Sequence, residues 1–257
     1  MKTSHWIIVA IVIVLIGGFT FWALKQSKKD DNSNTKSDTN TADQQTNESQ
    51  SNADTTNLNS NSTNNTNSTA NAQGCNRVVD KKAMQDPIDI KNKFVTLSVE
   101  GFGDIKVQLY DQDAPKTVEN FLRLTKSGYY DCLTFHRIAK GFVIQGGDPT
   151  GTGSGGDSAF GGEFADELNP NTPSAKEGYK HGVLAMANRG PNTNTSQFFI
   201  MLADNQLPFN YTIFGKVVAG LDIVDKIGGV PITPQMGPTD GTPVNKVTIT
   251  KATISDK

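Results

Sequence analysis

The chain has 257 residues, with 24 Lys and Arg against 26 Asp and Glu, a formal net charge of −2, two cysteines and three histidines. Without an excess of positive charge it lacks the usual means of binding phosphates, so we expect no nucleic acid partner. Two cysteines and three histidines are too few for an iron–sulfur protein or an array of zinc ribbons. The average composition is that of a globular protein, but it conceals three segments of different character.

An apolar run without charges extends from Trp6 to Leu24. As a helix it would measure roughly 28 Å, close to the hydrocarbon thickness of a bilayer. We therefore predict that residues 1–24 form a transmembrane signal-anchor. A cleaved secretory signal is the alternative, because such signals also contain an apolar run. Three lysines follow the run closely and favour a cytoplasmic C-terminal part by the positive-inside rule, against the extracytoplasmic location that we predict below.

Residues 25–74 are rich in Asn, Thr and Ser, and Leu58 is their only large apolar side chain. Such a segment cannot bury enough surface to offset its ordering entropy, so we predict a disordered linker that acts as a tether. An adhesive Asn-rich tract is the alternative. Residues 75–90 are transitional in composition, and residues 91–257 have the length and composition of one folded domain.

Alternating apolar residues predict a hairpin of two strands, at 94–99 and 105–109, joined by a glycine-containing turn. Asp113 as a capping residue, the proline at 115 and helical spacing predict a helix that ends near Gly128. The same reasoning places further strands at 134–139, 142–145, 183–187, 197–202, 212–218 and 244–254, and a second helix at 221–227. Many short strands with two helices favour a mainly β closed barrel over a doubly wound sheet.

Two other features suggest different chemistry and are better explained as structural. The glycines at 151–156 match the dinucleotide-binding pattern, but no strand leads directly into them and no helical spacing follows, so we expect a flexible loop. No nucleophile elbow accompanies His136 or His181, and two separated histidines do not make a zinc site. We expect His136 to be a hydrogen-bonded structural residue.

Cys75 and Cys132 form a disulfide if the fold brings their Cα atoms within about 7 Å; two unrelated thiols are the alternative. One pair in a chain otherwise without cysteine is typical of an exported protein, because disulfides persist in oxidising compartments. The possible pair therefore favours an extracytoplasmic domain.

The most unusual sequence lies in two motifs, FHRIAKGFVIQGGD at 135–148 and MANRGPNTNTSQFFI at 186–200. If Arg137 and Gln145 lie on adjacent strands near Phe142 and Phe199, a cationic fork and an amide border an aromatic pocket. Apolar walls with a few fixed polar groups are typical of a ligand site. A barrel core with a surface arginine explains the same pattern, and the residues alone leave both possibilities open.

At these motifs, and at 129–131 and 212–217, the sequence resembles the cyclophilin family of peptidyl-prolyl cis-trans isomerases. The resemblance implies a closed eight-stranded antiparallel barrel capped by two helices, with no metal and no organic cofactor. It also implies that Arg137 is the catalytic arginine and Gln145 the glutamine beside it. The implied substrate-binding residues are Phe142, Val143, Ala187, Asn188, Gln197, Phe199, Leu207 and Tyr211.

Four positions depart from the family pattern. Leu207 is nearest to a tryptophan found in many members, Tyr211 replaces a histidine, Val143 replaces a commoner methionine, and Arg189 stands where a small residue is often found. The changes at Leu207 and Tyr211 affect the expected affinity for cyclosporin-type macrocycles more than the expected turnover.

The predicted protein is a monomeric, membrane-anchored prolyl isomerase with its domain on the extracytoplasmic side. Its expected partners are proline-containing unfolded or nascent polypeptides, and its expected role is to assist the folding of exported proteins. A surface scaffold that binds proline-containing segments without turnover is the main alternative. An adhesin in which the tether carries the function is a third.

Overall fold

The structure is a computed structural model, and it describes residues 68–70 and 75–256. The predicted anchor at 1–24 and most of the predicted linker at 25–74 lie outside the described residues. Within the described ranges, no helix is both long and apolar enough to cross a bilayer. The described residues belong to one compact unit, Asn65–Lys257.

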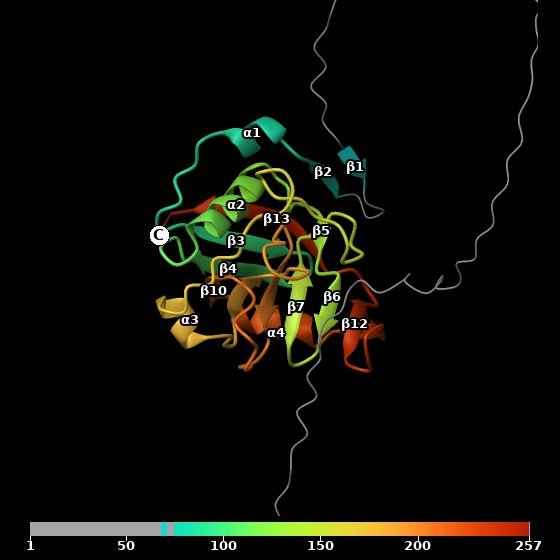
Figure 1. Cartoon of the computed structure of the whole chain (residues 1–257). Helices are drawn as coiled ribbons and strands as arrows, with labels where there is room; N and C mark the ends of the chain where they lie inside the picture. Colours follow the sequence, from blue (N-terminus) through green and yellow to red (C-terminus); the bar gives the residue numbers. More distant parts are fainter. Residues whose placement is uncertain (1–67, 71–74, 257) are drawn as a thin grey trace, which may run out of the picture. The chain divides into compact units, whose positions relative to one another are not determined.

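Most of the strands form one antiparallel sheet (Figure 1). The order of its strands is β11-β12-β6-β7-β9-β8-β10-β4-β3-β13-β5. A separate small sheet pairs β1 with β2. The strands are β1 (Ser68–Ala70), β2 (Asn76–Val78), β3 (Phe94–Val99), β4 (Gly103–Leu109), β5 (Leu133–Thr134), β6 (Arg137–Ala139), β7 (Val143–Gly146), β8 (Val183–Met186), β9 (Phe198–Met201), β10 (Ile213–Ala219), β11 (Ile232–Pro234), β12 (Asp240–Pro243) and β13 (Thr248–Ser255).

The mainly β antiparallel prediction is confirmed, whereas its finer part, a closed barrel of eight strands, is not shown for the described residues. The large sheet has eleven strands and two ends, β11 and β5. The predicted strand at 134–139 is in fact two strands, because Phe135 donates its N–H to Val247 O at 2.9 Å, whereas Arg137 pairs with Gln145 on β7. The chain thus changes its pairing partner from β13, next to β5, to β7, next to β6, within two residues. The backbone between β5 and β6 therefore joins β5, at one end of the sheet, covalently to β6, near the other end.

Besides β1 and β2, two further short strands, β11 and β12, are absent from the sequence prediction. Both contain proline and lack the alternation of apolar side chains that marks a strand. Their pairing comes from the backbone, with Thr233 opposite Thr242 and Gly241 opposite Ile138 on β6.

The interior of the curved sheet holds the main hydrophobic core, here called the interior cluster. Alternation along β3 and β4 sends Val95, Leu97, Ile105 and Val107 into it. The two longer helices, α2 (Pro115–Lys126) and α4 (Leu221–Gly228), confirm both predicted helices, and each buries apolar side chains in the same cluster. Helix α2 packs against β13, and α4 against β4 and β7 (Figure 1). Two five-residue helices, α1 (Lys81–Gln85) and α3 (Pro173–Glu177), were not predicted.

The start of α2 differs from the prediction, because Asp113 does not cap it. Ala114 occupies the N-cap position and offers no side-chain hydrogen bond. The carboxylate of Glu167 instead accepts the backbone N–H groups of Lys116 at 3.0 Å and Thr117 at 2.8 Å. Asp113 accepts from the N–H of Ser174 at the start of α3.

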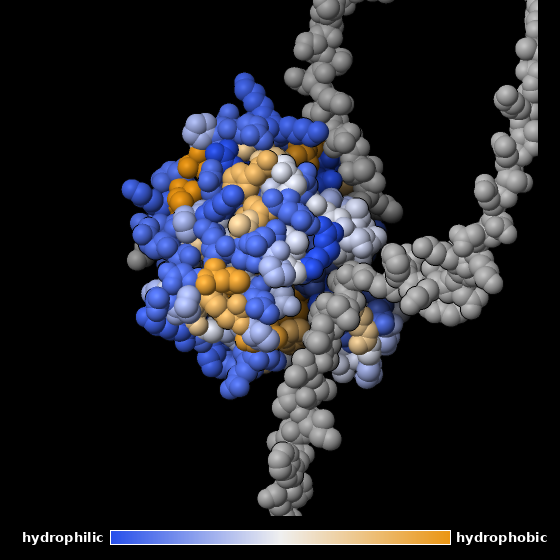
Figure 2. Space-filling model, in the orientation of Figure 1, coloured by the Kyte–Doolittle hydropathy of each residue, from blue (hydrophilic) through white to orange (hydrophobic). Residues whose placement is uncertain are grey.

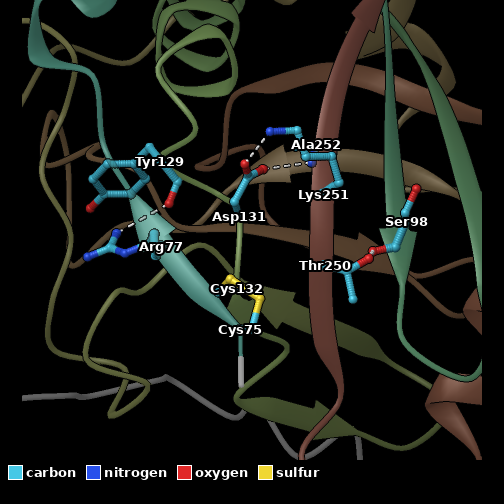
Figure 3. The surroundings of a disulfide bond; sticks show 9 residues. All are labelled: Cys75, Arg77, Ser98, Tyr129, Asp131, Cys132, Thr250, Lys251 and Ala252. Carbon is cyan, nitrogen blue, oxygen red and sulfur yellow. Dashed lines mark hydrogen bonds and ion pairs between the residues drawn. A yellow bond between two sulfur atoms is a disulfide. The ribbon is translucent and has the colours of Figure 1, made fainter. Parts of the chain in front are cut away.

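Residues 75–90, here called the strap, pack onto the domain rather than merely leading to it. The disulfide expected from the sequence joins Cys75 to Cys132, with 5.7 Å between the Cα atoms (Figure 3). Arg77 donates to Tyr129 O at 3.2 Å, and its guanidinium lies 5.3 Å from the centre of that tyrosine ring. Arg123 of α2 donates to the carbonyl of Met84 at 3.0 Å. The apolar side chains of the strap that pack on the interior cluster are Val79, Met84, Ile88 and Ile90.

The face of the domain drawn in Figure 2 is mostly hydrophilic, and its apolar side chains form separate small patches. The most exposed large apolar side chains of the described residues are Val78, Phe160, Val218, Met236 and Val244.

Candidate functional site

The register of five strands places a row of side chains across the outer face of the sheet. Arg137 on β6 lies opposite Gln145 on β7, which lies opposite Phe199 on β9, followed by Ala185 on β8 and Ile213 on β10. Residues directly opposite one another in antiparallel strands share a face. The row therefore has a polar end at Arg137 and Gln145 and an apolar end beyond them.

The apolar end belongs to a second hydrophobic cluster, here called the outer cluster, which is separate from the interior cluster. Its partly buried members contact the buried ones and remain in part accessible to a ligand. The buried members are Ala139, Val143, Tyr179, Val183, Ala185, Phe199, Met201 and Ile213, and the partly buried ones are Tyr110, Phe142, Ala187, Leu207, Phe209 and Tyr211. Strands β7, β8 and β9 are buried throughout, because one face packs on the interior cluster and the other on the outer cluster.

Six of the eight predicted substrate-binding residues belong to the outer cluster: Phe142, Val143, Ala187, Phe199, Leu207 and Tyr211. The rings of Phe199 and Tyr211 meet edge to face with 5.6 Å between their centres. The structure thus brings together side chains from motifs that are distant in sequence.

Arg137 is fixed at the polar end of the row by three hydrogen bonds. Its Nη1 donates to Oε1 of Gln145 at 2.9 Å. Its Nε and Nη2 donate to the two carboxylate oxygens of Asp240, at 2.9 Å and 2.6 Å. The side chains of Arg137 and Asp240 are only 14% and 16% exposed, so little water competes for these bonds.

Gln145 connects Arg137 to Gln197, the seventh of the predicted binding residues. Nε2 of Gln145 donates to Oε1 of Gln197 at 2.9 Å. Nε2 of Gln197 donates in turn to the carbonyls of Gly153 and Gly155, at 2.9 Å and 2.7 Å. The two amides are thereby oriented, with each oxygen accepting and each nitrogen donating.

Asn188, the eighth predicted binding residue, uses its side chain within the protein. Its Nδ2 donates to Asn210 O at 2.9 Å, and its Oδ1 accepts from Gly190 at 3.3 Å. The amide thus connects the loop after β8 to the residue before Tyr211, on the border of the outer cluster.

The glycine-rich loop at 151–156 wraps around a carboxylate. Asp148 accepts backbone N–H groups from Thr150, Thr152, Gly153 and Gly155. Burial raises the pKa of Asp148, but the hydrogen bonds from Thr150, Gly155 and Gly153 outweigh it, so the pKa lies below its usual value. Because the loop amides already bind this carboxylate, they are not arranged to hold a pyrophosphate.

His136 is buried, but the prediction of a hydrogen-bonded residue is not confirmed, because its ring nitrogens have no hydrogen-bond partner among the described residues. Burial lowers its pKa; Asp148 opposes this shift, and Arg137 adds to it. His136 also lines a cavity of about 180 Å³ beside Cys132 and Asp148, and none of the predicted catalytic or substrate-binding residues lines this cavity. The candidate site is therefore an open surface on the outer cluster rather than this cavity.

Tyr179 supports the floor of the outer cluster. Its hydroxyl donates to Tyr211 O at 2.8 Å and accepts the N–H of Tyr211 at 3.1 Å. Burial raises the pKa of Tyr179 to about 12. No group of three or more acidic, histidine or cysteine residues suited to a metal ion occurs in the part of the chain that the structure describes.

Comparison with known proteins identifies this arrangement. Residues 94–254 match the family model described as cyclophilin type peptidyl-prolyl cis-trans isomerase/CLD. The chain belongs to the cyclophilin family. A peptidyl-prolyl cis-trans isomerase of Arabidopsis thaliana is 44% identical over 168 residues, which cover 63% of this chain and 93% of the relative. The human peptidyl-prolyl cis-trans isomerase-like protein 1 is 48% identical over 145 residues, covering 56% of this chain and 85% of the relative.

Solved cyclophilin structures agree with this assignment. A crystal structure of a cyclophilin type isomerase from Cryptosporidium parvum has a TM-score of 0.57 and 38% identity, and covers 65% of this chain and 99% of that one. A second structure of the same protein, determined in the presence of the dipeptide Ala-Pro, matches equally well and covers 64% of this chain. The enzyme class predicted from the sequence, a cyclophilin-type peptidyl-prolyl isomerase, is confirmed.

The sequence analysis did not identify Asp240, which accepts the shortest hydrogen bond of Arg137 in this cyclophilin, at 2.6 Å. Asp240 follows Gly237, Pro238 and Thr239 and precedes Gly241, so its surroundings indicate an ordinary turn. It lies 103 positions from Arg137, and only the pairing of β12 with β6 brings the two together. A prediction of sheet order could have found it, whereas no local pattern could.

Proposed function

We propose that this cyclophilin accelerates rotation about X-Pro bonds in exported proteins while they fold, on the outer side of a membrane to which residues 1–24 anchor it. One observation carries the proposal for the site: a guanidinium held by Asp240 and Gln145 at the edge of the outer cluster. The disulfide between Cys75 and Cys132 supports the location, because such bonds persist in oxidising compartments. Membrane anchoring is supported only by the apolar run at the N-terminus.

The reaction breaks no bond, so it needs no nucleophile. Rotation about a peptide bond meets a barrier of about 18–20 kcal/mol, and X-Pro bonds equilibrate over tens to hundreds of seconds. In the twisted transition state the amide resonance is lost and the prolyl nitrogen regains a lone pair. An N–H of Arg137 can donate to that lone pair, and neither planar isomer offers the same acceptor, so the interaction favours the transition state.

The required stabilisation exceeds what one hydrogen bond supplies. Turnover in milliseconds needs about 7 kcal/mol at roughly 1.36 kcal/mol per tenfold change in rate. A hydrogen bond to a charged group contributes about 1.5–3 kcal/mol. We assign the remainder to orientation: the proline ring binds on the outer cluster around Phe142 and Phe199, while Gln197 and the backbone at Ala187 hold the flanking residues.

Replacement of Arg137 by alanine tests the proposed role. The Arg137→Ala chain should fold, retain its affinity for a proline peptide within a few-fold, and lose about 10- to 100-fold in kcat/KM. The rate is measured by exchange NMR on a short Ala-Pro peptide, and the affinity by titration. Near wild-type turnover would contradict the role of Arg137.

The same assay separates the enzyme from the alternative of a non-catalytic scaffold. A scaffold would bind the peptide yet leave its cis–trans exchange rate at the uncatalysed value with the wild-type chain. A large acceleration by the wild type and a loss in Arg137→Ala support the enzyme.

The location requires an experiment on cells. Protease added to intact cells should remove the domain if it lies outside the membrane, and a cytoplasmic marker protein should survive as the control. A domain that is protected until the cells are lysed would contradict the extracytoplasmic location.

A further inference from the structure

Asp240 places a carboxylate against the guanidinium of Arg137 from a neighbouring strand. Its Cα lies opposite Ala139 in the pairing of β12 with β6, and Arg137 is two residues from Ala139 on the same face of β6. From this diagonal position both carboxylate oxygens accept from the arginine, Oδ1 from Nε at 2.9 Å and Oδ2 from Nη2 at 2.6 Å. This is a bidentate pair, which fixes orientation as well as distance.

The contacts divide the five N–H groups of the guanidinium into two sets. Nε, one N–H of Nη2 and one N–H of Nη1 bind Asp240 and Gln145. One N–H on each of Nη1 and Nη2 makes no hydrogen bond to a described residue and remains for a substrate. The guanidinium plane is therefore set before a substrate arrives.

We infer that Asp240 is a positioning residue for the isomerisation: it holds Arg137 so that the two remaining N–H groups are aimed at the prolyl nitrogen. The inference rests on the proposed role of Arg137. An unpaired guanidinium would be the stronger donor, so the benefit of the ion pair must come from orientation. Misplacement of a reacting group by about 1 Å costs up to about 100-fold in rate.

The alternative is that Asp240 only anchors β12 to the sheet. Backbone bonds already do this, because Gly241 pairs with Ile138, and Lys140 donates its N–H to Thr239 O at 2.8 Å. Removal of the carboxylate should therefore leave the strand in place while it frees the arginine.

Asp131 provides a matched control. Its carboxylate is 13% exposed, close to the 16% of Asp240, and it pairs with Lys251 at 2.6 Å and accepts the N–H of Ala252 at 3.0 Å (Figure 3). It contacts neither Arg137 nor the outer cluster. Its replacement measures the cost of losing a carboxylate of the same burial.

The experiment compares Asp240→Ala, Asp240→Asn, Asp240→Glu and Asp131→Ala in the full chain. It measures kcat and KM separately on an Ala-Pro peptide, together with the melting temperature. In Asp240→Ala and Asp240→Asn, kcat should fall by about 10- to 100-fold while KM stays within about twofold, because the outer cluster is unchanged. Asp240→Glu, which keeps a carboxylate, should restore part of kcat, and Asp131→Ala should lower the melting temperature but keep kcat.

A second readout follows Arg137 itself. The Nε–H of Arg137 should exchange slowly with solvent in the wild type and rapidly in Asp240→Asn, as followed by NMR. Values of kcat within twofold of the wild type in both Asp240→Ala and Asp240→Asn would overturn the inference, as would equal losses in Asp131→Ala. An inactive wild type would overturn the proposed function together with the inference, whereas an active wild type with unchanged Asp240 variants would overturn the inference alone.

Discussion

Arg137 illustrates at the residue scale why a rigid donor suits a reaction without bond cleavage. Its planar fork meets Asp240 and Gln145 at the same time, which a lysine ammonium cannot do with the same geometry. Because Asp240 and Gln145 lie on strands of the sheet, their hydrogen bonds fix the position of the Arg137 charge.

Arg137→Lys separates charge from geometry. Lysine keeps the positive charge but loses the bidentate contact with Asp240, so we expect kcat to fall almost as far as in Arg137→Ala, by about tenfold or more. Exchange NMR on the Ala-Pro peptide gives the rate, and a titration should show peptide affinity within about twofold of the wild type. A lysine variant with more than half of the wild-type kcat would mean that charge alone suffices.

The burial of His136 makes the stability of the domain sensitive to acid. Because its pKa is lowered in the folded state, the unfolded chain takes up a proton first as the pH falls below about 6.5. Folding stability should therefore decrease from pH 6.5 downward, by at most about 1.4 kcal/mol per pH unit for this group, until the folded state is protonated too. Urea unfolding at pH 7 and pH 5 measures this decrease. The free energy of unfolding of His136→Leu should fall less between the two pH values than that of the wild type.

The control for this measurement is His181→Gln, which removes the partly exposed histidine near Asp225. If the wild type and His136→Leu lose equal stability between pH 7 and pH 5, His136 is not the source of the acid sensitivity.

At the scale of elements, the N-terminus of α2 is capped by Glu167, a residue far away in the sequence. Pro115 begins the helix, but its first free N–H groups are bound by Glu167 rather than by a local cap. A carboxylate at a helix N-terminus both accepts these bonds and interacts favourably with the helix dipole. The long-range contact thus connects the loop before α3 to the helix that covers the interior cluster.

Glu167→Ala should lower the free energy of unfolding by about 1–2 kcal/mol, because the N–H groups of Lys116 and Thr117 lose their acceptor. Urea unfolding followed by fluorescence or circular dichroism measures the change. Glu163→Ala is the control: this carboxylate pairs with Arg189 on an exposed surface, where an ion pair contributes about 0–1 kcal/mol. Equal effects of the two substitutions would refute the capping role of Glu167.

For the molecule as a whole, the strap extends the folded unit toward the N-terminus. The disulfide closes a loop of 57 positions between Cys75 and Cys132, and the strap also packs apolar side chains on the interior cluster. The bond therefore restricts the unfolded chain and holds the strap on the folded domain.

Reduction of the disulfide should destabilise the domain by about 2–4 kcal/mol. Denaturant unfolding of the oxidised and the reduced chain measures this difference, and hydrogen exchange should increase first in residues 75–90. A chain with both cysteines replaced by serine should not respond to reductant. Equal unfolding midpoints before and after reduction would show that the strap is held without the bond.

The sequence by itself determined the main β elements, both longer helices, the family and the possible cysteine pair. These follow from local alternation, helical spacing and contiguous motifs, which are properties of short segments. The short strands β11 and β12 were not predicted, because their proline and glycine residues interrupt the alternation of apolar side chains that marks a strand.

Only the tertiary structure decided which residues complete the site. Asp240 meets Arg137, Glu167 meets α2, and the predicted strand at 134–139 divides between two partners, because each depends on sheet order and on contacts between residues tens of positions apart. The sequence around each of these residues does not indicate which distant residue it contacts. The chemistry of the arginine can therefore be read from the sequence, whereas its orientation is a property of the folded sheet.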